Sequence, residues 1–386
     1  CWSDYQPIAE REASSLPVSN GMKKRASVDK PLALLILILL VGGCLIFASA
    51  AFGLLARGAT NMSSVVFSHL VLGVGLGVVA LLIGATVDYH RWRRYAPYIY
   101  ALAILATLAV FLPYIGFTHG GARRWLVVSG VSFQPSELLK IASILFAASY
   151  FAAIKTKVTS FTYGFGGFAA LLALPALALV LQPDIGTLGI ICISVLAIFF
   201  AAGASWKQLG AVICVGLVAL ALVAYNKPYV RERLVTFVYP SQGQHDQSYQ
   251  IKQSLIAVGS GGVFGRGFGQ GIQKFTYLPE PMGDSIFAVA AEELGFVGSV
   301  FIVALFLAFA LRGFSIAARA PDLFGSLLAV GLSTYLGIEA FINIASMLGV
   351  APVTGIPLTF ISQGGSAMLA SLGSAGLLLN ISRRRS

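Results

Sequence analysis

Long apolar runs separated by short polar connections dominate the chain from Leu32 to Leu379. A run of about twenty apolar residues is long enough to cross the hydrocarbon core of a membrane as a helix. These runs are too numerous and too free of charge to form the core of a soluble all-α protein. The pattern therefore predicts an all-α integral membrane protein with about ten transmembrane helices. The predicted spans are 32–56, 65–87, 96–116, 137–155, 166–182, 186–204, 208–225, 285–311, 323–349 and 365–382.

One connection, residues 226–284 between the seventh and eighth spans, is much longer than the others. Connections of this length in compact proteins are either functional or disordered, and this one is too apolar for disorder. Its segment QSYQIKQSLIAVGSGG has the pattern of an amphipathic helix, which would lie at the membrane interface. We therefore expect an ordered loop on the surface of the membrane.

Positive charge is distributed unevenly between the two sides of the predicted bundle. Most of the 26 Lys and Arg residues fall on the side that holds both chain ends, whereas the short loops opposite hold only Arg57, Arg123 and Arg124. Cytoplasmic loops are enriched in Lys and Arg, so both termini are predicted in the cytoplasm and loop 226–284 outside it. A basic face against anionic lipid explains the net charge of +11, and nucleic acid is not an expected partner.

Composition agrees with a membrane protein, because 57% of the residues are hydrophobic and only 11% are charged. Cys44, Cys192 and Cys214 lie in apolar runs, where they behave as small hydrophobes, and no Cys or His spacing suits a metal or a disulfide framework. Residues 1–20 are polar and contain no signal-peptide pattern, and residues 1–31 are predicted to form a disordered cytoplasmic tail. Residues 32–386 are predicted to form a single membrane domain.

The second outer loop and the span after it read THGGARRWLVVSGVSFQPSELLKI. Arg123 and Arg124 lie on the side where cations are disfavoured, which indicates a partner. Guanidinium groups bind phosphate well, although a structural pair bonding loop carbonyls is an equal alternative. Glu137 and Lys140 follow at a spacing that lets them pair on one helix face. That pair could be a scaffold for a site or a purely structural bridge.

The turn LQPDIGT brings Gln182 and Asp184 to the same outer surface. Asp184 could cap the next helix, help to ligate a cation or hold an arginine. The glycine cluster GSGGVFGRGFGQG, residues 259–271, matches neither the phosphate-loop nor the dinucleotide-binding template. It predicts instead a backbone that turns tightly beside a ligand or the membrane.

The stretch YLPEPMGDSIFAVAAEELGFVG carries Asp284, Glu292 and Glu293 into or against the hydrocarbon. Carboxylates there are costly unless they have a function. At the start of a helix, the dipole favours the ionised form of Asp284, while nearby hydrocarbon raises its pKa. Such an acid suits a general base, and an N-cap is the alternative. Small residues on its helix face leave room for a neighbouring helix or a ligand: Ala288, Ala291 and Gly295.

The segment GVAPVTGIPLTFISQGGS, residues 349–366, contains too many Pro and Gly residues for a helix. A non-helical backbone at membrane depth is tolerated only inside protein or beside a water-filled cavity. We therefore expect a cavity that opens outward near Asp284 and the two arginines.

Four motifs in order resemble the SEDS family of shape, elongation, division and sporulation proteins. They are RRWL with FQPSELLKI, LQPDIGT, YLPEPMGDSIFAVAAEELGFVG, and GVAPVTGIPLTFISQGGS with SLGSAGLLLNIS. The resemblance covers roughly residues 30–383, and QKFTYLPEP is more similar to the division and sporulation branch, FtsW and its relatives, than to the elongation branch, RodA. The sequence departs from the family pattern at Gly283 and Ser285, on either side of Asp284, and at Gln363, before the final Gly-Gly. These three residues lie next to motif positions that would orient the substrate.

The resemblance implies ten transmembrane helices and a peptidoglycan glycosyltransferase that polymerises lipid II into β-1,4 glycan strands. It maps the essential acid of the family onto Asp284, with Arg123, Glu137, Lys140 and Gln182 also in family motifs. On this interpretation Asp284 removes the acceptor proton, and Arg123 and Arg124 stabilise the undecaprenyl diphosphate leaving group. Gln182 and Asp184 would contact substrate, and Glu137 and Lys140 would support the site.

The same resemblance implies a class B penicillin-binding protein and other divisome membrane proteins as partners. It also implies a position in the bacterial cytoplasmic membrane at the division septum. No dedicated metal cage is evident, but a divalent cation, Mg or Mn, on the substrate diphosphate is left open. Two alternatives remain at this point: a lipid II flippase, which needs the cavity and arginines but no base, and a non-catalytic scaffold of the septal synthase.

Overall fold

The computed structural model describes residues 28–56, 62–113, 116–119, 122–128, 131–239 and 245–384. Most of the predicted N-terminal tail therefore lies outside the described residues. The α-helices are α1 Lys30–Ala56, α2 Met62–Phe67, α3 Leu76–Thr86, α4 Tyr89–Leu108, α5 Pro135–Ile154, α6 Gly167–Leu181, α7 Ile185–Ala201, α8 Trp206–Asn226, α9 Pro228–Val238, α10 His245–Ser260, α11 Gln273–Thr276, α12 Ile286–Ala318, α13 Leu323–Met347 and α14 Gly365–Ser382. Short η segments extend several of them: η2 Ser68–Gly75, η3 Ala109–Phe111, η4 Lys155–Thr159 and η5 Phe161–Gly166.

All ten predicted spans are confirmed as helices at the expected places. In the part of the chain that the structure describes, nine helices are long and apolar enough to cross a membrane, and α7 is a shorter apolar helix. The second span is composite, since the π-helical η2 separates α2 from α3. Helix α5 begins at Pro135, where the first helical turn does not need the missing amide of proline.

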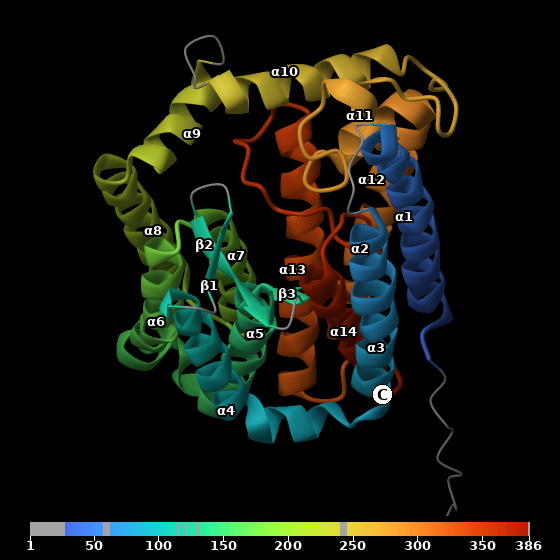
Figure 1. Ribbon diagram of the computed structural model, residues 1–386. Helices are drawn as coiled ribbons and strands as arrows, with labels where there is room; N and C mark the ends of the chain where they lie inside the picture. The colour runs from blue at the N-terminus through green and yellow to red at the C-terminus, as the bar shows by residue number, and fades with distance from the viewer. Residues whose placement is uncertain are drawn as a thin grey trace, which may run out of the picture.

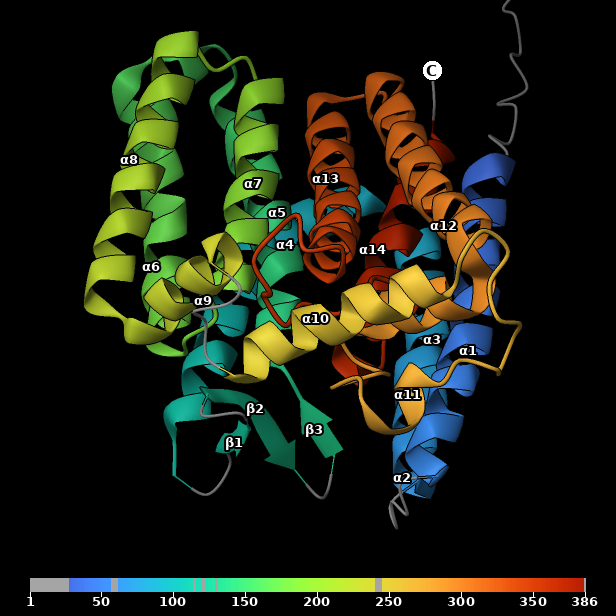
Figure 2. The same ribbon diagram turned by 90° about the horizontal axis from the view of Figure 1, so that it is seen from above.

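The helices stand side by side, and the chain crosses one end of the bundle through α9 and α10 (Figure 1). The C-terminus lies at the opposite end, so loop 226–284 and the C-terminus are on different sides of the bundle. Figure 2 shows α13 and α14 surrounded by neighbours, whereas α8 stands at the edge. Accordingly, α13 buries large side chains such as Phe324 and Tyr335, while most side chains of α8 are exposed.

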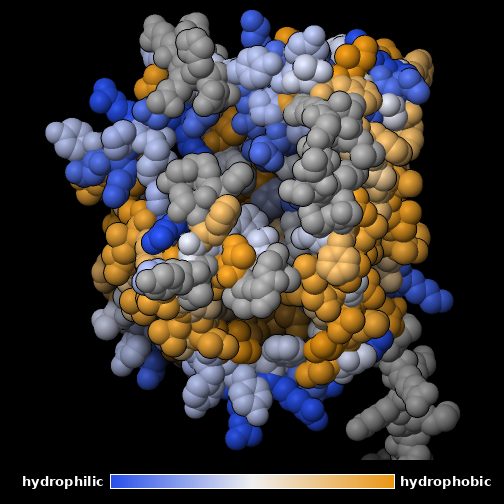
Figure 3. All heavy atoms as spheres, viewed as in Figure 1, coloured by the Kyte–Doolittle hydropathy of each residue, from blue (hydrophilic) through white to orange (hydrophobic). Residues whose placement is uncertain are grey.

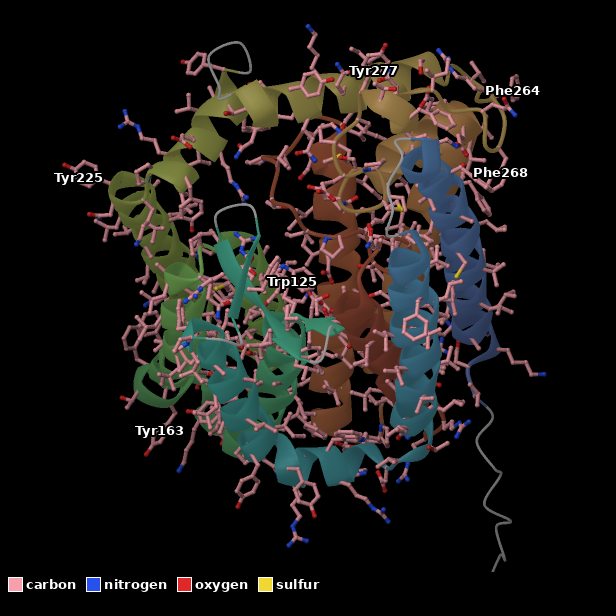
Figure 4. The ribbon with its side chains drawn as sticks, in the orientation of Figure 1. Trp125, Tyr163, Tyr225, Phe264, Phe268 and Tyr277 are labelled. Atoms are coloured by element: carbon pink, nitrogen blue, oxygen red, sulfur yellow. The ribbon has the colours of Figure 1, made fainter. Side chains whose placement is uncertain are left out.

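The surface has the character expected of a membrane protein. Figure 3 shows hydrophobic residues gathered around the middle of the molecule and hydrophilic residues at both ends. Two exposed aromatic side chains, Tyr163 before α6 and Tyr225 at the end of α8, lie towards opposite ends of the bundle (Figure 4). Tyrosine is enriched at both membrane–water interfaces, so these positions are consistent with the boundaries of the apolar belt.

The second outer loop forms a small antiparallel sheet that the sequence analysis did not predict. Its strands are β1 Gly116–His119, β2 Ala122–Val128 and β3 Val131–Phe133, in the order β1-β2-β3. Phe117 pairs with Trp125, and Leu126 pairs with Phe133. The strands are rich in aromatic and β-branched residues, which favour extended backbone. The sheet holds Arg123 and Arg124 on one strand, β2.

In the residues that the structure describes, the long outer loop contains α9, α10 and α11, and the predicted amphipathic helix is confirmed as α10. This loop contacts α12, which has 33 residues and would be about 50 Å long as a straight helix. The hydrocarbon core is only about 30 Å thick. A break at Gly295 (φ 71°, ψ −166°) divides α12, so that its outer third stays with the loop rather than with the membrane-spanning part.

Residues 262–267, called the glycine segment below, are inserted at this break. In an unbroken helix the amides of residues 296 and 297 would bond to the carbonyls of residues 292 and 293. Here the glycine segment provides a partner for each group. The four bonds are Phe296 N to Gly262 O (2.9 Å), Val297 N to Val263 O (3.1 Å), Arg266 N to Glu292 O (3.0 Å) and Gly267 N to Glu293 O (3.1 Å).

Glycine is required where the two backbones meet. Gly265 and Gly295 both have positive φ, and a Cβ on Gly295 would collide with the backbone of Gly265. A Cβ on Gly265 would likewise collide with the carbonyl of Glu293. The predicted tight turn is thus confirmed, and its neighbour in the structure is the broken helix α12. Of the small residues of α12 that were expected to leave room, Gly295 lies directly against the glycine segment, and the backbone of Ala291 lies against Gly261 just before it.

Candidate active site at the outer end of α12

Asp284 lies two residues before α12 and is not its N-cap. The helix begins at Ile286, with Ser285 at the N-cap and no side-chain capping hydrogen bond there. Instead, the Asp284 carboxylate accepts a hydrogen bond of 3.0 Å from Nε2 of Gln250 on α10. The same Gln250 nitrogen lies 3.0 Å from the Ser285 hydroxyl. The carboxylate is therefore oriented by the outer loop, and its role is not to begin the helix.

The backbone around Asp284 is fixed by two other parts of the chain. Asn343 of α13 donates to the carbonyl oxygens of Asp284 and Ile356, each at 2.8 Å. Ser362 donates to the carbonyl of Gly283 at 2.7 Å. These bonds tie the turn before α12 to residues 348–364, a segment with no regular helix, as predicted. Five of its apolar side chains are buried inside protein, Val353, Ile356, Leu358, Phe360 and Ile361, whereas Val350 is exposed; the expected outward cavity stays a prediction.

The environment of Asp284 favours its protonated form more than water does. Burial raises the pKa of Asp284 from 3.8 to about 6, and the nearby Glu280 carboxylate acts in the same direction, while the hydrogen bond from Gln250 opposes them. With a pKa of about 6, about nine in ten of these side chains are ionised at pH 7. The group is thus both available as a base at neutral pH and more basic than an ordinary Asp.

Arg124 extends from β2 to the turn between α6 and α7. Its Nε donates to the Gln182 carbonyl at 3.3 Å, its terminal nitrogen donates to the Pro183 carbonyl, and another lies 3.9 Å from the Asp184 carboxylate. Arg124 therefore contacts loop carbonyls in this structure, the structural alternative foreseen from the sequence. The neighbouring Arg123 is exposed, so the two arginines differ in their surroundings.

Gln182 and Asp184 have defined structural contacts as well. The buried Gln182 amide donates to the Thr107 carbonyl at the end of α4. Asp184 is the N-cap of α7, accepting from the Thr187 amide at 3.4 Å and from its hydroxyl at 3.0 Å. The Ser136 hydroxyl of α5 lies 3.5 Å from the same carboxylate. These contacts place both residues beside Arg124, where they fix the α6–α7 turn.

Arg233 of α9 is a candidate that the sequence analysis did not single out. Its guanidinium donates to the Thr354 carbonyl at 3.3 Å. Burial lowers the pKa of Arg233, and the Arg124 guanidinium acts in the same direction, whereas the Asp184 and Asp284 carboxylates oppose them. Arg233 is therefore close enough to interact electrostatically with both Asp284 and Arg124. The available signal was a second cluster of cations, YVRERLVTF, on the side where cations are disfavoured.

Glu137 and Lys140 pair as predicted, with 2.9 Å between Oε2 and Nζ. The structure adds Glu339 of α13, whose carboxylate lies 2.5 Å from the same ammonium. All three side chains are almost completely buried, and buried charges are tolerated only with close partners. The ammonium also lies over the ring of Tyr335. This cluster joins α5 to α13 one helical turn from Asn343, and so supports the residue that holds Asp284.

Glu292 and Glu293 tie the outer loop to α12. Glu292 accepts from the amide of Ile272 at 2.9 Å, while Glu293 lies 2.5 Å from the Lys274 ammonium and 2.7 Å from the Ser49 hydroxyl. Both carboxylates are buried. Glu292 and Glu293 therefore have structural contacts, whereas Asp284 interacts electrostatically with Arg233. Over the described ranges, no group of three or more His, Cys, Asp or Glu side chains is placed to hold a metal ion.

Comparisons with known proteins identify the family of the chain. The model of the FtsW/RodA/SpoVE family, described as cell cycle proteins, matches residues 30–386. Stage V sporulation protein E of Bacillus subtilis (strain 168) is 37% identical over 360 residues, which cover 93% of this chain and 98% of that protein. A protein of Geobacter sulfurreducens named probable peptidoglycan glycosyltransferase FtsW is 40% identical over 322 residues, covering 82% of this chain and 84% of that protein.

Two solved structures are similar over nearly the whole fold. One is a chain from a study of the structural coordination of polymerization and crosslinking by a peptidoglycan synthase complex, with a TM-score of 0.73 and 28% identity. The other is the rod shape determining protein RodA of Thermus thermophilus, with a TM-score of 0.67 and 27% identity. Each match covers 93% of this chain and 98% of the other. The chain is thus a multi-pass membrane protein that belongs to the FtsW/RodA/SpoVE family, the SEDS family whose motifs its sequence carries.

Proposed function

We propose that this protein is a peptidoglycan glycosyltransferase that polymerises lipid II into β-1,4 glycan strands and releases undecaprenyl diphosphate. Membership of the family supports the proposal, as do relatives that are named probable peptidoglycan glycosyltransferase FtsW. The observation that carries it is the Asp284 carboxylate, whose pKa is raised to about 6 at the outer end of α12. In this reaction a base must remove the proton of the acceptor 4-hydroxyl as the new glycosidic bond forms.

Cationic groups around the acid support the second half of the reaction. The diphosphate of the donor leaves with developing negative charge, which fixed positive groups stabilise well. Arg123 and Arg124 of β2 and Arg233 of α9 would bind it, with Gln182 and Asp184 fixing the neighbouring turn. Glu137 and Lys140, through Glu339, would keep α13 in place. A divalent cation, Mg or Mn, bound mainly by the diphosphate itself, fits the same role.

The position of the acid also supports the proposed cellular setting. Asp284 lies at the end of the bundle opposite the C-terminus, and the positive-inside pattern assigns both termini to the cytoplasm. Polymerisation would then occur at the outer face of the bacterial cytoplasmic membrane, at the septum during division. The similar chain from a peptidoglycan synthase complex supports a class B penicillin-binding protein as partner, together with other divisome membrane proteins.

The test is polymerisation of labelled lipid II by the purified chain, with and without a cognate penicillin-binding protein, read as strand length on gels. Asp284→Asn should reduce the rate about 100-fold or more, the usual scale for losing a general base. Asp322→Asn is a matched control, because Asp322 caps α13 at the other end of the bundle, accepting from the Gly325 amide at 2.9 Å. Asn keeps that bond, so this variant should polymerise normally.

The outcomes separate the proposed reaction from its alternatives. Polymer of normal length from the Asp284→Asn variant would show that the carboxylate is not the base. Translocation of lipid II without any polymer from the unmodified chain would identify a flippase. Partner binding with neither activity would identify a scaffold.

A further inference from the structure

An apolar groove lies between α1 and α12, away from the arginines of β2 and α9. Its volume is about 180 Å³, and every lining residue is aliphatic, phenylalanine or glycine. On α1 the lining extends from Ile38 to Ile46, about 12 Å along the helix axis. Phe268, which follows the glycine segment, closes the outer end, and Figure 4 shows its side chain at the edge of the molecule beside α1.

The groove opens towards the membrane. Leu45 on its α1 side and Phe301 on its α12 side are 54% and 58% exposed, and both lie in membrane-spanning helices. An occupant must therefore come from the lipid phase and be apolar along its length. A transmembrane helix is too large, since 12 Å of a helix that is about 10–12 Å across occupies roughly 1,000 Å³, several times the volume of the groove. A single extended hydrocarbon chain is the occupant that fits.

The inner wall of the groove is continuous with the turn that carries the acid. Ile361 lines the groove, and the next residue, Ser362, donates to the carbonyl of Gly283. Gly283 directly precedes Asp284. A chain lying in the groove would thus run along the segment that holds the acid in place, which favours the lipid tail of a bound substrate over an arbitrary membrane lipid.

We propose that the groove between α1 and α12 binds the isoprenoid chain of the lipid-linked substrate. The identity of that substrate rests on the proposed function, whereas the binding of an isoprenoid chain does not require polymerisation. Gly42 is central to the argument, because it lines the groove and a Cβ built on it would meet no atom within 4 Å. Its missing side chain leaves part of the space open.

The first experiment is photolabelling with an undecaprenyl phosphate analogue that carries a diazirine in its chain. The label should appear on peptides of α1 and α12, and Gly42→Leu should remove most of it. Gly216→Leu is the matched control: Gly216 lies on the exposed helix α8 and also has open space around its Cβ position. Labelling that excess phosphatidylglycerol displaces as readily as undecaprenyl phosphate would identify an ordinary lipid-contact surface and overturn the proposal.

The second experiment compares lipid II with long and short isoprenoid chains. The unmodified protein and Gly216→Leu should prefer the long chain through a lower KM. In Gly42→Leu the ratio of kcat/KM between the two substrates should fall by about tenfold, the effect of leaving about two methylene groups unburied. An unchanged ratio in Gly42→Leu would overturn the proposal. If no variant polymerises either substrate, the proposed function fails, and the photolabelling still decides about the groove.

Discussion

Replacing Asp284 by Asn should make the folded protein more stable at neutral pH while it reduces the polymerisation rate about 100-fold or more. The folded state raises the pKa of this carboxyl from 3.8 to about 6, so folding favours the protonated form. Between these two values the unfolded chain releases its proton first, and stability falls as the pH rises. Above pH 6 the ionised group opposes folding by up to about 3 kcal/mol. The neutral amide of Asn removes this opposition.

The assay is a pair of thermal melts of purified protein in detergent, at pH 7.5 and at pH 4.0. Asp284→Asn should melt several degrees above the unmodified protein at pH 7.5 and close to it at pH 4.0, where the native acid is largely protonated when folded. Asp322→Asn should show no such gain, because Asp322 caps α13. A lower melting temperature for Asp284→Asn at pH 7.5 would refute the reasoning and make the carboxylate a structural group.

Three further changes test the surroundings of the acid. Gln250→Leu removes a hydrogen bond to the Asp284 carboxylate, worth about 1.5–3 kcal/mol. The acidic limb of the pH–rate profile should therefore move up by about 1–2 pH units from about 6, with activity recovered near pH 9. An unchanged acidic limb would contradict this. Arg233→Lys keeps the positive charge but loses the planar, two-pronged guanidinium. The polymerisation rate should fall about tenfold, while the melting temperature stays unchanged. Full activity would exclude a role of Arg233 in diphosphate binding. Lys274→Met leaves Glu293 buried without its ammonium partner and should cost about 3–5 kcal/mol of stability, measured as a lower melting temperature; an unchanged melt would show that the pair is dispensable.

The membrane spans could be predicted because each depends only on a local property, the length of an apolar run. Helix α10 was predictable for a related reason, since amphipathic spacing is also local. The sheet β1–β3 was missed although WLVVSGVSF carries a usable signal, two β-branched runs around Ser-Gly. Strand pairing joins residues of separate runs, so neither run alone predicts the sheet.

The candidate site was predictable only in part, because its contacts join distant parts of the chain. The motifs pointed to Asp284 and Lys140, but nothing local identifies Gln250, which is 34 residues from Asp284. Glu339 is 199 residues from Lys140, and in the sequence it is a single acid inside an apolar span. For Asp184 the sequence left capping and ligand binding open, and the choice depends on where Thr187 and Arg124 lie in three dimensions.

The break at Gly295 has a consequence for the way the protein is made. The glycine segment precedes α12 in the chain and must cross the membrane before it can reach the break. Until then the freed amides and carbonyls at the outer boundary of the membrane would lack these partners, at several kcal/mol for each group that is buried unpaired, so α12 is more stable as a continuous helix. The bend forms when residues 262–267 replace the lost helical bonds. During biogenesis, the acid therefore reaches its place against α10 only after the outer loop has been translocated and has folded.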